Sequence, residues 1–209
     1  MELNALDFVL HIDKYLGLII DKFGYLTYII IFLVIFAETG LVITPFLPGD
    51  SLLFALGTLV AKGLLNLVII FLTLLAAAFI GDNTNYWIGR KIGRKAFETG
   101  NHFFKKEYLE RTEHFYSKHG GKTIIIGRFV PIIRTFVPFV AGIGRMNYLK
   151  FLFFSVAGNL IWVSIFLFTG YFFGNLPFVK DNFSLVIMLV IIISIAPGLY
   201  EFFRRKVLK

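Results

Sequence analysis

The sequence predicts an all-α polytopic membrane protein. Of its 209 residues, 57% are hydrophobic, 18% are aromatic and only 16% are charged, and the mean hydropathy is +0.79. This composition is typical of membrane proteins and unlike that of soluble domains. Long apolar runs recur along the chain, and two of them are interrupted by paired prolines. No low-complexity linker divides the chain, so we expect a single membrane domain over residues 1–209.

The first interrupted run, residues 24–60, predicts a re-entrant hairpin. One straight helix of this length would measure about 54 Å and exceed the ~30 Å hydrocarbon core, whereas two full spans need ~20 residues each. We therefore expect helices over 25–37 and 51–60, with unwound chain from Glu38 to Asp50. The expected breaks are Pro45, Pro48 and Gly49. Unwound backbone at membrane depth must be buried in protein or line a wet cavity.

The second interrupted run, residues 123–145, predicts a second re-entrant hairpin. It is broken by Pro131 and Pro138, and its charges are Arg128 and Arg134. Each arginine at the centre of a membrane costs about 2.5–3.5 kcal/mol on insertion scales, which argues against a lipid-facing position. We expect these arginines to face the carboxylates of the first hairpin across a polar cavity.

The remaining segments complete the predicted domain. They are an interfacial amphipathic helix over 1–23, transmembrane helices over 64–89, 148–173 and 183–203, and a basic loop over 90–122. The loop carries nine Lys or Arg against four Glu, and the positive-inside rule places it in the cytoplasm. Its aromatic residues indicate an amphipathic segment on anionic lipid. Nucleic-acid binding is disfavoured because the loop is tethered to a membrane bundle.

The positive-inside rule also orients the rest of the chain. With the basic loop inside, the second hairpin enters from the cytoplasm, the next helix crosses outward, and the last helix returns the basic C-terminus to the cytoplasm. The first hairpin then enters from outside. Hairpin plus span thus occurs twice in opposite orientation, followed by one more helix. Such an inverted repeat with broken helices is typical of alternating-access transporters.

Two features of the 64–89 span carry separate predictions. Asp82 lies near its end, where it could pair with an arginine or lie among lipid headgroups, and the sequence leaves both open. Gly81, Asn85 and Gly89 recur four residues apart, a spacing that predicts close packing against another helix.

The charged residues of the hairpins indicate what the protein handles. The guanidinium groups of Arg128 and Arg134 match phosphate oxygens bidentately, and helix N-termini add partial positive charge. Glu38 and Asp50 would neutralise the arginines in the empty state, and a carboxylate removed from water can exchange a proton. We therefore expect an anionic phosphate headgroup as cargo, coupled to protonation of Glu38, Asp50 or Asp82. In the alternative interpretation, the charges only lock the hairpins together as buried salt bridges.

Catalysis, cofactors and metals are not expected. Membrane lipid phosphatases need histidines near the reacting phosphate, yet no Ser-Gly-His motif occurs and neither hairpin contains a histidine. The histidines have no recognised metal-ligand spacing, and the chain has no cysteine.

Three motifs together resemble the DedA family, the bacterial membrane proteins that carry the VTT, or SNARE-associated, domain. They are Glu38-x-Gly40-x(4)-Pro45-x-x-Pro48-Gly49-Asp50, then Gly81-Asp82-x(3)-Tyr86-x-x-Gly89-Arg90-x-x-Gly93, then Arg128-Phe129-x-Pro131-x-x-Arg134-x(3)-Pro138-x(3)-Gly142. The resemblance covers residues 25–173.

The resemblance implies a more specific function. It implies recycling of undecaprenyl phosphate across the bacterial cytoplasmic membrane, with membrane lipids, a polyprenyl phosphate and protons as partners. It also implies functional roles for Glu38, Asp50, Arg128 and Arg134. The family's links to the proton-motive force make a proton-dependent ion or drug exporter an alternative, and its scramblase relatives make passive lipid scrambling another. The sequence leaves the cargo and the oligomeric state open, a homo-oligomer included.

Overall fold

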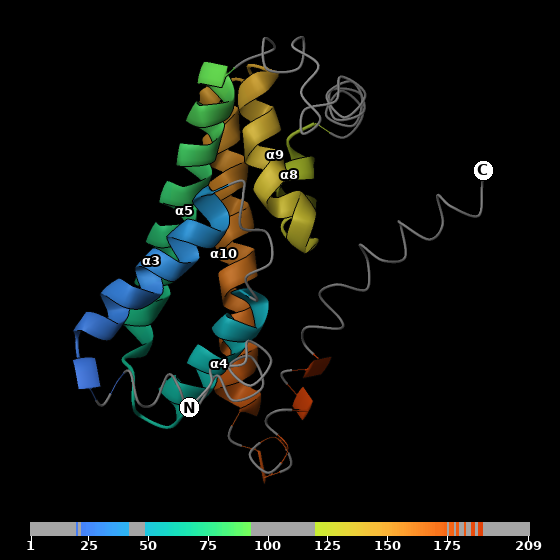
Figure 1. The fold of residues 1–209 in the computed structure, drawn as a ribbon. Coiled ribbons are helices and arrows are strands. Elements are labelled where there is room, and N and C mark those ends of the chain that lie inside the picture. The colour runs from blue at the N-terminus through green and yellow to red at the C-terminus, as the bar shows by residue number, and fades with distance from the viewer. Residues whose placement is uncertain are drawn as a thin grey trace. The chain divides into compact units, whose positions relative to one another are not determined.

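The computed structural model of the protein describes residues 20, 22–41, 49–92, 120–174 and scattered positions from 176 to 189, and its regular elements there are all helices, joined by turns. The helices named here are α3 (Leu26–Gly40), α4 (Gly49–Ala61), α5 (Leu67–Ile92), α8 (Lys122–Gly127), α9 (Pro131–Ile143) and α10 (Tyr148–Phe173) (Figure 1). No strand occurs among these residues. The expectations for Pro45, Pro48, nearly all of 1–23, most of the basic loop and most of the last span lie outside the described residues.

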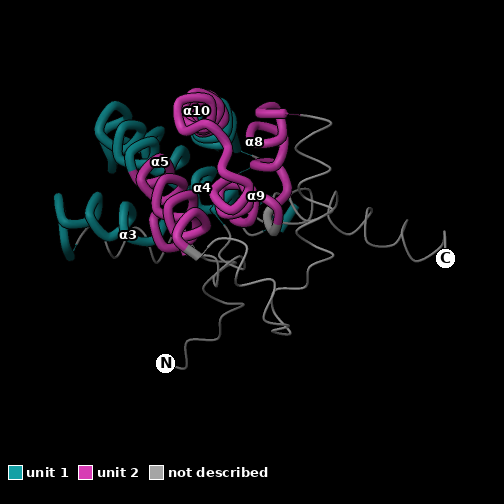
Figure 2. Tube along the Cα trace, turned by 90° about the horizontal axis from the view of Figure 1, so that it is seen from above, with its two compact units in different colours: residues 1–35, 47–76, 161–209 teal, residues 36–46, 77–160 magenta. Residues whose placement is uncertain are grey.

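The chain divides into two compact units (Figure 2). Unit 1 comprises residues 1–35, 47–76 and 161–209, and unit 2 comprises residues 36–46 and 77–160. Helices α3, α5 and α10 therefore contribute residues to both units.

Helices α5 and α10 are long and apolar enough to cross a membrane. Each has 26 residues and begins directly after an asparagine. The Asn66 Oδ1 accepts hydrogen bonds from the backbone N–H of Val68 and Ile69, and the Asn147 Oδ1 accepts one from Lys150. These contacts satisfy donors that the first turn of a helix leaves without partners, which explains where both helices begin.

The distribution of polarity differs from that in a soluble protein in two ways. Large apolar side chains on α5 and α10, including Val68, Leu72, Leu149 and Phe153, are exposed. The charged side chains of Glu38, Asp82, Arg128 and Arg134 are buried. Apolar surface of this kind is stable against hydrocarbon and not against water, in agreement with a membrane protein.

Glycines allow close helix contacts of the same pattern in the two units. In unit 1, a Cβ on Gly57 of α4 would overlap the Leu167 carbonyl oxygen of α10, and a Cβ on Gly170 would overlap the Phe54 carbonyl oxygen. In unit 2, a Cβ on Gly142 of α9 would overlap the Tyr86 carbonyl oxygen of α5, and one on Gly89 would overlap that of Phe139. In each unit, therefore, a Phe-x-x-Gly sequence packs against a glycine near the end of a long helix. The close packing expected for Gly89 is confirmed.

We expect Gly142→Ala to destabilise the protein by about 1–3 kcal/mol, because the new methyl group forces α9 away from α5. Gly144→Ala is the matched control, since its Cβ would lie 3.3 Å from the Val140 carbonyl oxygen at a backbone φ of −70°. Unfolding in mixed micelles measures both variants. Equal stabilities of the two variants would contradict the packing described here.

The helix ends correct several sequence-based boundaries. Helix α3 continues to Gly40, so Glu38 lies in its last turn and not in unwound chain, and Asp50 lies in the first turn of α4. Pro131 begins α9, as proline can at a first helical position, but Pro138 lies inside α9 and does not break it. Gly49 likewise begins a helix.

Helix α5 also differs from its expected range. It begins three residues later than position 64 and continues past position 89 to Ile92. Asn83 and Thr84 fit within it because their side chains bond to the carbonyl oxygens of Phe79 and Ile80, four residues earlier. The basic segment that was expected from residue 90 therefore begins on this helix.

Candidate functional site

The first buried ion pair of unit 2 joins Glu38 to Arg134. A guanidinium N–H of Arg134 donates to Glu38 Oε1, and the two residues are 4% and 0% exposed. Glu38 comes from the last turn of α3, and Arg134 comes from the first turn of α9. The pair therefore joins the first interrupted run, at the end of α3, to the second interrupted run, at the start of α9.

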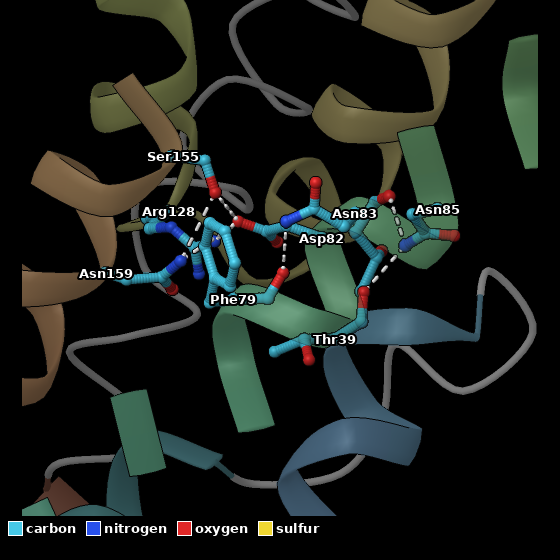
Figure 3. Close-up of polar contacts among 9 residues, drawn as sticks. Thr39, Phe79, Asp82, Asn83, Asn85, Arg128, Ser155 and Asn159 are labelled. Atoms are coloured by element: carbon cyan, nitrogen blue, oxygen red, sulfur yellow. Dashed lines mark hydrogen bonds and ion pairs between the residues drawn. The ribbon is translucent and has the colours of Figure 1, made fainter. Parts of the chain in front are cut away.

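The second buried ion pair of unit 2 joins Asp82 of α5 to Arg128, which follows α8. The Asp82 carboxylate also accepts hydrogen bonds from Ser155 Oγ at 2.5 Å and Asn159 Nδ2 at 3.1 Å (Figure 3). Three donors thus converge on Asp82 Oδ2, one from Arg128 and two from α10. The Arg128 stem lies against Gly158 of α10, where a Cβ would be 3.1 Å from Arg128 Cδ.

Asn85 connects the backbone beside the first ion pair. Its Nδ2 donates to the Thr39 carbonyl oxygen at 2.6 Å and to the Thr135 carbonyl oxygen at 3.2 Å (Figure 3). Thr39 directly follows Glu38, and Thr135 directly follows Arg134. Because one amide holds both neighbouring carbonyls, Asn85 restricts how far the two charged residues can separate.

Asp50 belongs to unit 1. Its Oδ1 accepts a hydrogen bond from Trp162 Nε1 at 2.8 Å, and both residues are buried. Asp50 lies in the first turn of α4, where a carboxylate is favoured by the helix dipole.

The structure therefore places the predicted site residues in three contacts. Glu38 meets Arg134, Asp82 meets Arg128, and Asp50 meets Trp162. Of the two alternatives left open for Asp82, pairing with an arginine is the one observed. Within the described residues, no group of three or more His, Cys, Asp or Glu side chains could hold a metal ion.

Sequence reasoning missed the neutral polar residues of the site. Ser155 and Asn159 are four residues apart within a mostly apolar helix, a spacing that puts both on one face and could have indicated a buried polar site. Asn85 was assigned to close helix packing, yet it is a buried hydrogen-bond donor. Gly81, like Gly89, does fit that assignment, because a Cβ on Gly81 would overlap Thr39 Oγ1 and approach the Gly40 backbone to 3.0 Å.

Comparisons with known proteins agree with this architecture. The VTT domain family matches residues 47–172. Protein DedA of Escherichia coli is 50% identical over 204 residues, covering 96% of this chain and 93% of the relative. An uncharacterized membrane protein of Mycobacterium tuberculosis is 44% identical over 172 residues, covering 81% of this chain and 75% of the relative.

The inner membrane protein YqjA of Escherichia coli is also similar, at 35% identity over 176 residues, covering 82% of this chain and 80% of the relative. No solved structure matches the chain. The helical fold, the exposed apolar helices with buried charges and these similarities lead to one conclusion: the chain is a membrane protein of the DedA family, built around a VTT domain.

Proposed function

We propose that this protein is a proton-coupled transporter of an anionic lipid phosphate, with a polyprenyl phosphate such as undecaprenyl phosphate as cargo in the bacterial cytoplasmic membrane. The observation that carries the proposal is the buried pair of Glu38 and Arg134. A buried ion pair adds little stability relative to apolar packing, so its presence favours a role beyond structure. An arginine that can exchange its carboxylate partner for a phosphate would support transport and not catalysis.

The helix termini make both charges of this pair available for exchange. Glu38 lies at the C-terminal end of α3, where helix carbonyls disfavour negative charge, and Arg134 lies at the N-terminal end of α9, where positive charge is disfavoured. An anion beside Arg134 would instead be favoured by the α9 terminus and by the guanidinium fork. The local field therefore supports replacement of the Glu38 carboxylate by a phosphate.

This replacement gives the proton a defined role. Protonation of Glu38 would release Arg134, and the released guanidinium would bind the phosphate. Because proton and anion favour the same state, each increases the affinity for the other. We therefore propose that proton and lipid phosphate move in the same direction, toward the more alkaline side.

The other carboxylates have different proposed roles. Asp82 holds Arg128 beside the site, and Ser155 and Asn159 fix the position of its carboxylate by also donating to it. Asp50 is a second candidate proton carrier, oriented by its contact with Trp162.

The repeated features of the helices support alternating access. Both long helices have 26 residues, an asparagine cap and a glycine contact with a Phe-x-x-Gly sequence. Such matched elements are what an inverted repeat would produce, and inverted repeats with broken helices underlie many transporters.

The decisive experiment measures the cargo in proteoliposomes. The parent protein should transfer a fluorescent polyprenyl phosphate between leaflets faster than a phosphatidylcholine of the same label. Arg134→Lys keeps the charge but loses the planar fork, so we expect the transfer rate to fall about tenfold or more with little change in stability. Lys62→Gln is the control, because Lys62 is exposed in unit 1.

Other outcomes would contradict the proposal. Equal transfer of both lipids would indicate an unselective scramblase. Absence of lipid transfer, together with proton-dependent movement of a small ion or drug, would indicate the exporter instead. Normal transfer by Arg134→Lys would eliminate bidentate phosphate recognition.

A further inference from the structure

The C-terminal end of α5 carries a cation that belongs to neither buried ion pair. The Arg90 side chain is exposed, its Nη1 donates to Tyr86 Oη at 2.9 Å, and its guanidinium lies 5.5 Å from the centroid of the Trp87 ring. Within the described part of the chain, no carboxylate forms an ion pair with it. These contacts orient the guanidinium and leave its other N–H groups able to bind an anion.

Aromatic rings extend beside this arginine. Trp87 lies 5.4 Å from Tyr148 and 5.7 Å from Tyr86, measured between ring centroids, and Tyr86 stacks on Phe151 at 4.5 Å. The Tyr148 hydroxyl donates to Asn83 Oδ1 at 2.8 Å. Tryptophan and tyrosine concentrate where a membrane's hydrocarbon meets its headgroups, so this ring cluster places Arg90 at that level.

A second arginine lies on the connection between α9 and α10. Tyr86 Oη, which accepts from Arg90, donates to the Met146 carbonyl oxygen at 2.6 Å, and Arg145 directly precedes Met146. Arg145 is exposed and has a φ of 50°, the only positive φ of a non-glycine residue within the described segments. Glycine or asparagine adopts this conformation at lower cost, so an arginine held in it points to a role for its side chain.

We propose that Arg90 and Arg145, together with Trp87 and Tyr148, form an interfacial site for the phosphate of an anionic lipid headgroup. The guanidinium groups bind the phosphate oxygens, and the aromatic rings contact the glycerol region and the upper acyl chain. The site is separate from the Glu38–Arg134 and Asp82–Arg128 pairs, and its lipid is a bound membrane lipid and not transported cargo.

Tryptophan fluorescence tests the site directly. Trp87 is 44% exposed, whereas Trp162 is fully buried, so brominated lipid should quench mainly Trp87. In nanodiscs, brominated phosphatidylglycerol should quench the parent more than brominated phosphatidylcholine at equal content. Arg90→Gln should lower the apparent preference for phosphatidylglycerol over phosphatidylcholine roughly five-fold, because one cation near an anionic lipid surface contributes about 1 kcal/mol. A Trp87→Phe variant measures the remaining signal of Trp162.

Two further variants separate a site from general surface charge. Lys91→Gln removes a neighbouring exposed cation and should keep the preference. Arg145→Gly should weaken the preference while raising the unfolding midpoint, because glycine accepts a φ of 50° without strain. The proposal would be overturned if Lys91→Gln lost the preference for phosphatidylglycerol as much as Arg90→Gln does, or if the parent showed no such preference. The result does not depend on transport, so it is distinct from failure of the proposed function.

Discussion

Replacing Asp82 with leucine should lower the free energy of unfolding by about 3–5 kcal/mol, because the Arg128 charge would remain buried without this partner. Ser155 and Asn159 would also lose their shared acceptor. Thr84→Ala, two residues along the same helix, removes a hydroxyl that donates to the Ile80 carbonyl oxygen of its own helix and should change stability by less than about 0.5 kcal/mol. Unfolding in mixed micelles would measure both variants.

The double variant Asp82→Leu with Arg128→Met distinguishes structure from function. It removes both charges, so most of the lost stability should return, as it does when apolar residues replace buried ion pairs elsewhere. Transfer of the polyprenyl phosphate should nevertheless remain absent, since this variant lacks the positive charge that the proposal keeps beside the phosphate site. A stable double variant that transfers lipid at the parent rate would show that this ion pair is only structural.

Composition and charge placement made the all-helical, membrane-protein character and the burial of the two arginines predictable from the sequence. Arginine within an apolar run has few stable environments, so Arg128 and Arg134 had to be buried against carboxylates or a cavity. The partner of each arginine was not predictable. Glu38 and Asp82 are 96 and 46 residues from their arginines in sequence, and only helix packing determines which carboxylate each one meets.

Proline and glycine gave less reliable helix boundaries. Pro138 remains inside α9, because tertiary contacts such as that of Gly142 with α5 outweigh the loss of one helical hydrogen bond. Gly81 and Asp82 lie within α5, as the expected span over 64–89 required, since their low helix propensity costs at most about 1 kcal/mol each and both are packed against partners. The course of the hairpins through the membrane remains a prediction.

The proton coupling predicts a difference between driven and passive movement of lipid. In proteoliposomes that carry a two-unit pH gradient, a carrier that moves one proton with each lipid phosphate can accumulate the lipid about 100-fold, because each unit supplies 1.36 kcal/mol. Net movement should be toward the alkaline side, and it should reverse when the gradient is reversed. A scramblase equilibrates lipid between leaflets whatever the gradient.

Glu38→Gln identifies the group that carries the proton. Its neutral amide imitates protonated Glu38, so Arg134 should bind the lipid phosphate as tightly as in the parent or more tightly, and added lipid should raise the variant's unfolding midpoint. Lipid should no longer accumulate across the pH gradient. Asp50→Asn is the matched comparison, because Asp50 contacts the neutral Trp162 indole. Loss of accumulation in Asp50→Asn alone would assign the proton to Asp50, and equal transfer with and without the gradient in the parent would eliminate proton coupling and leave passive scrambling.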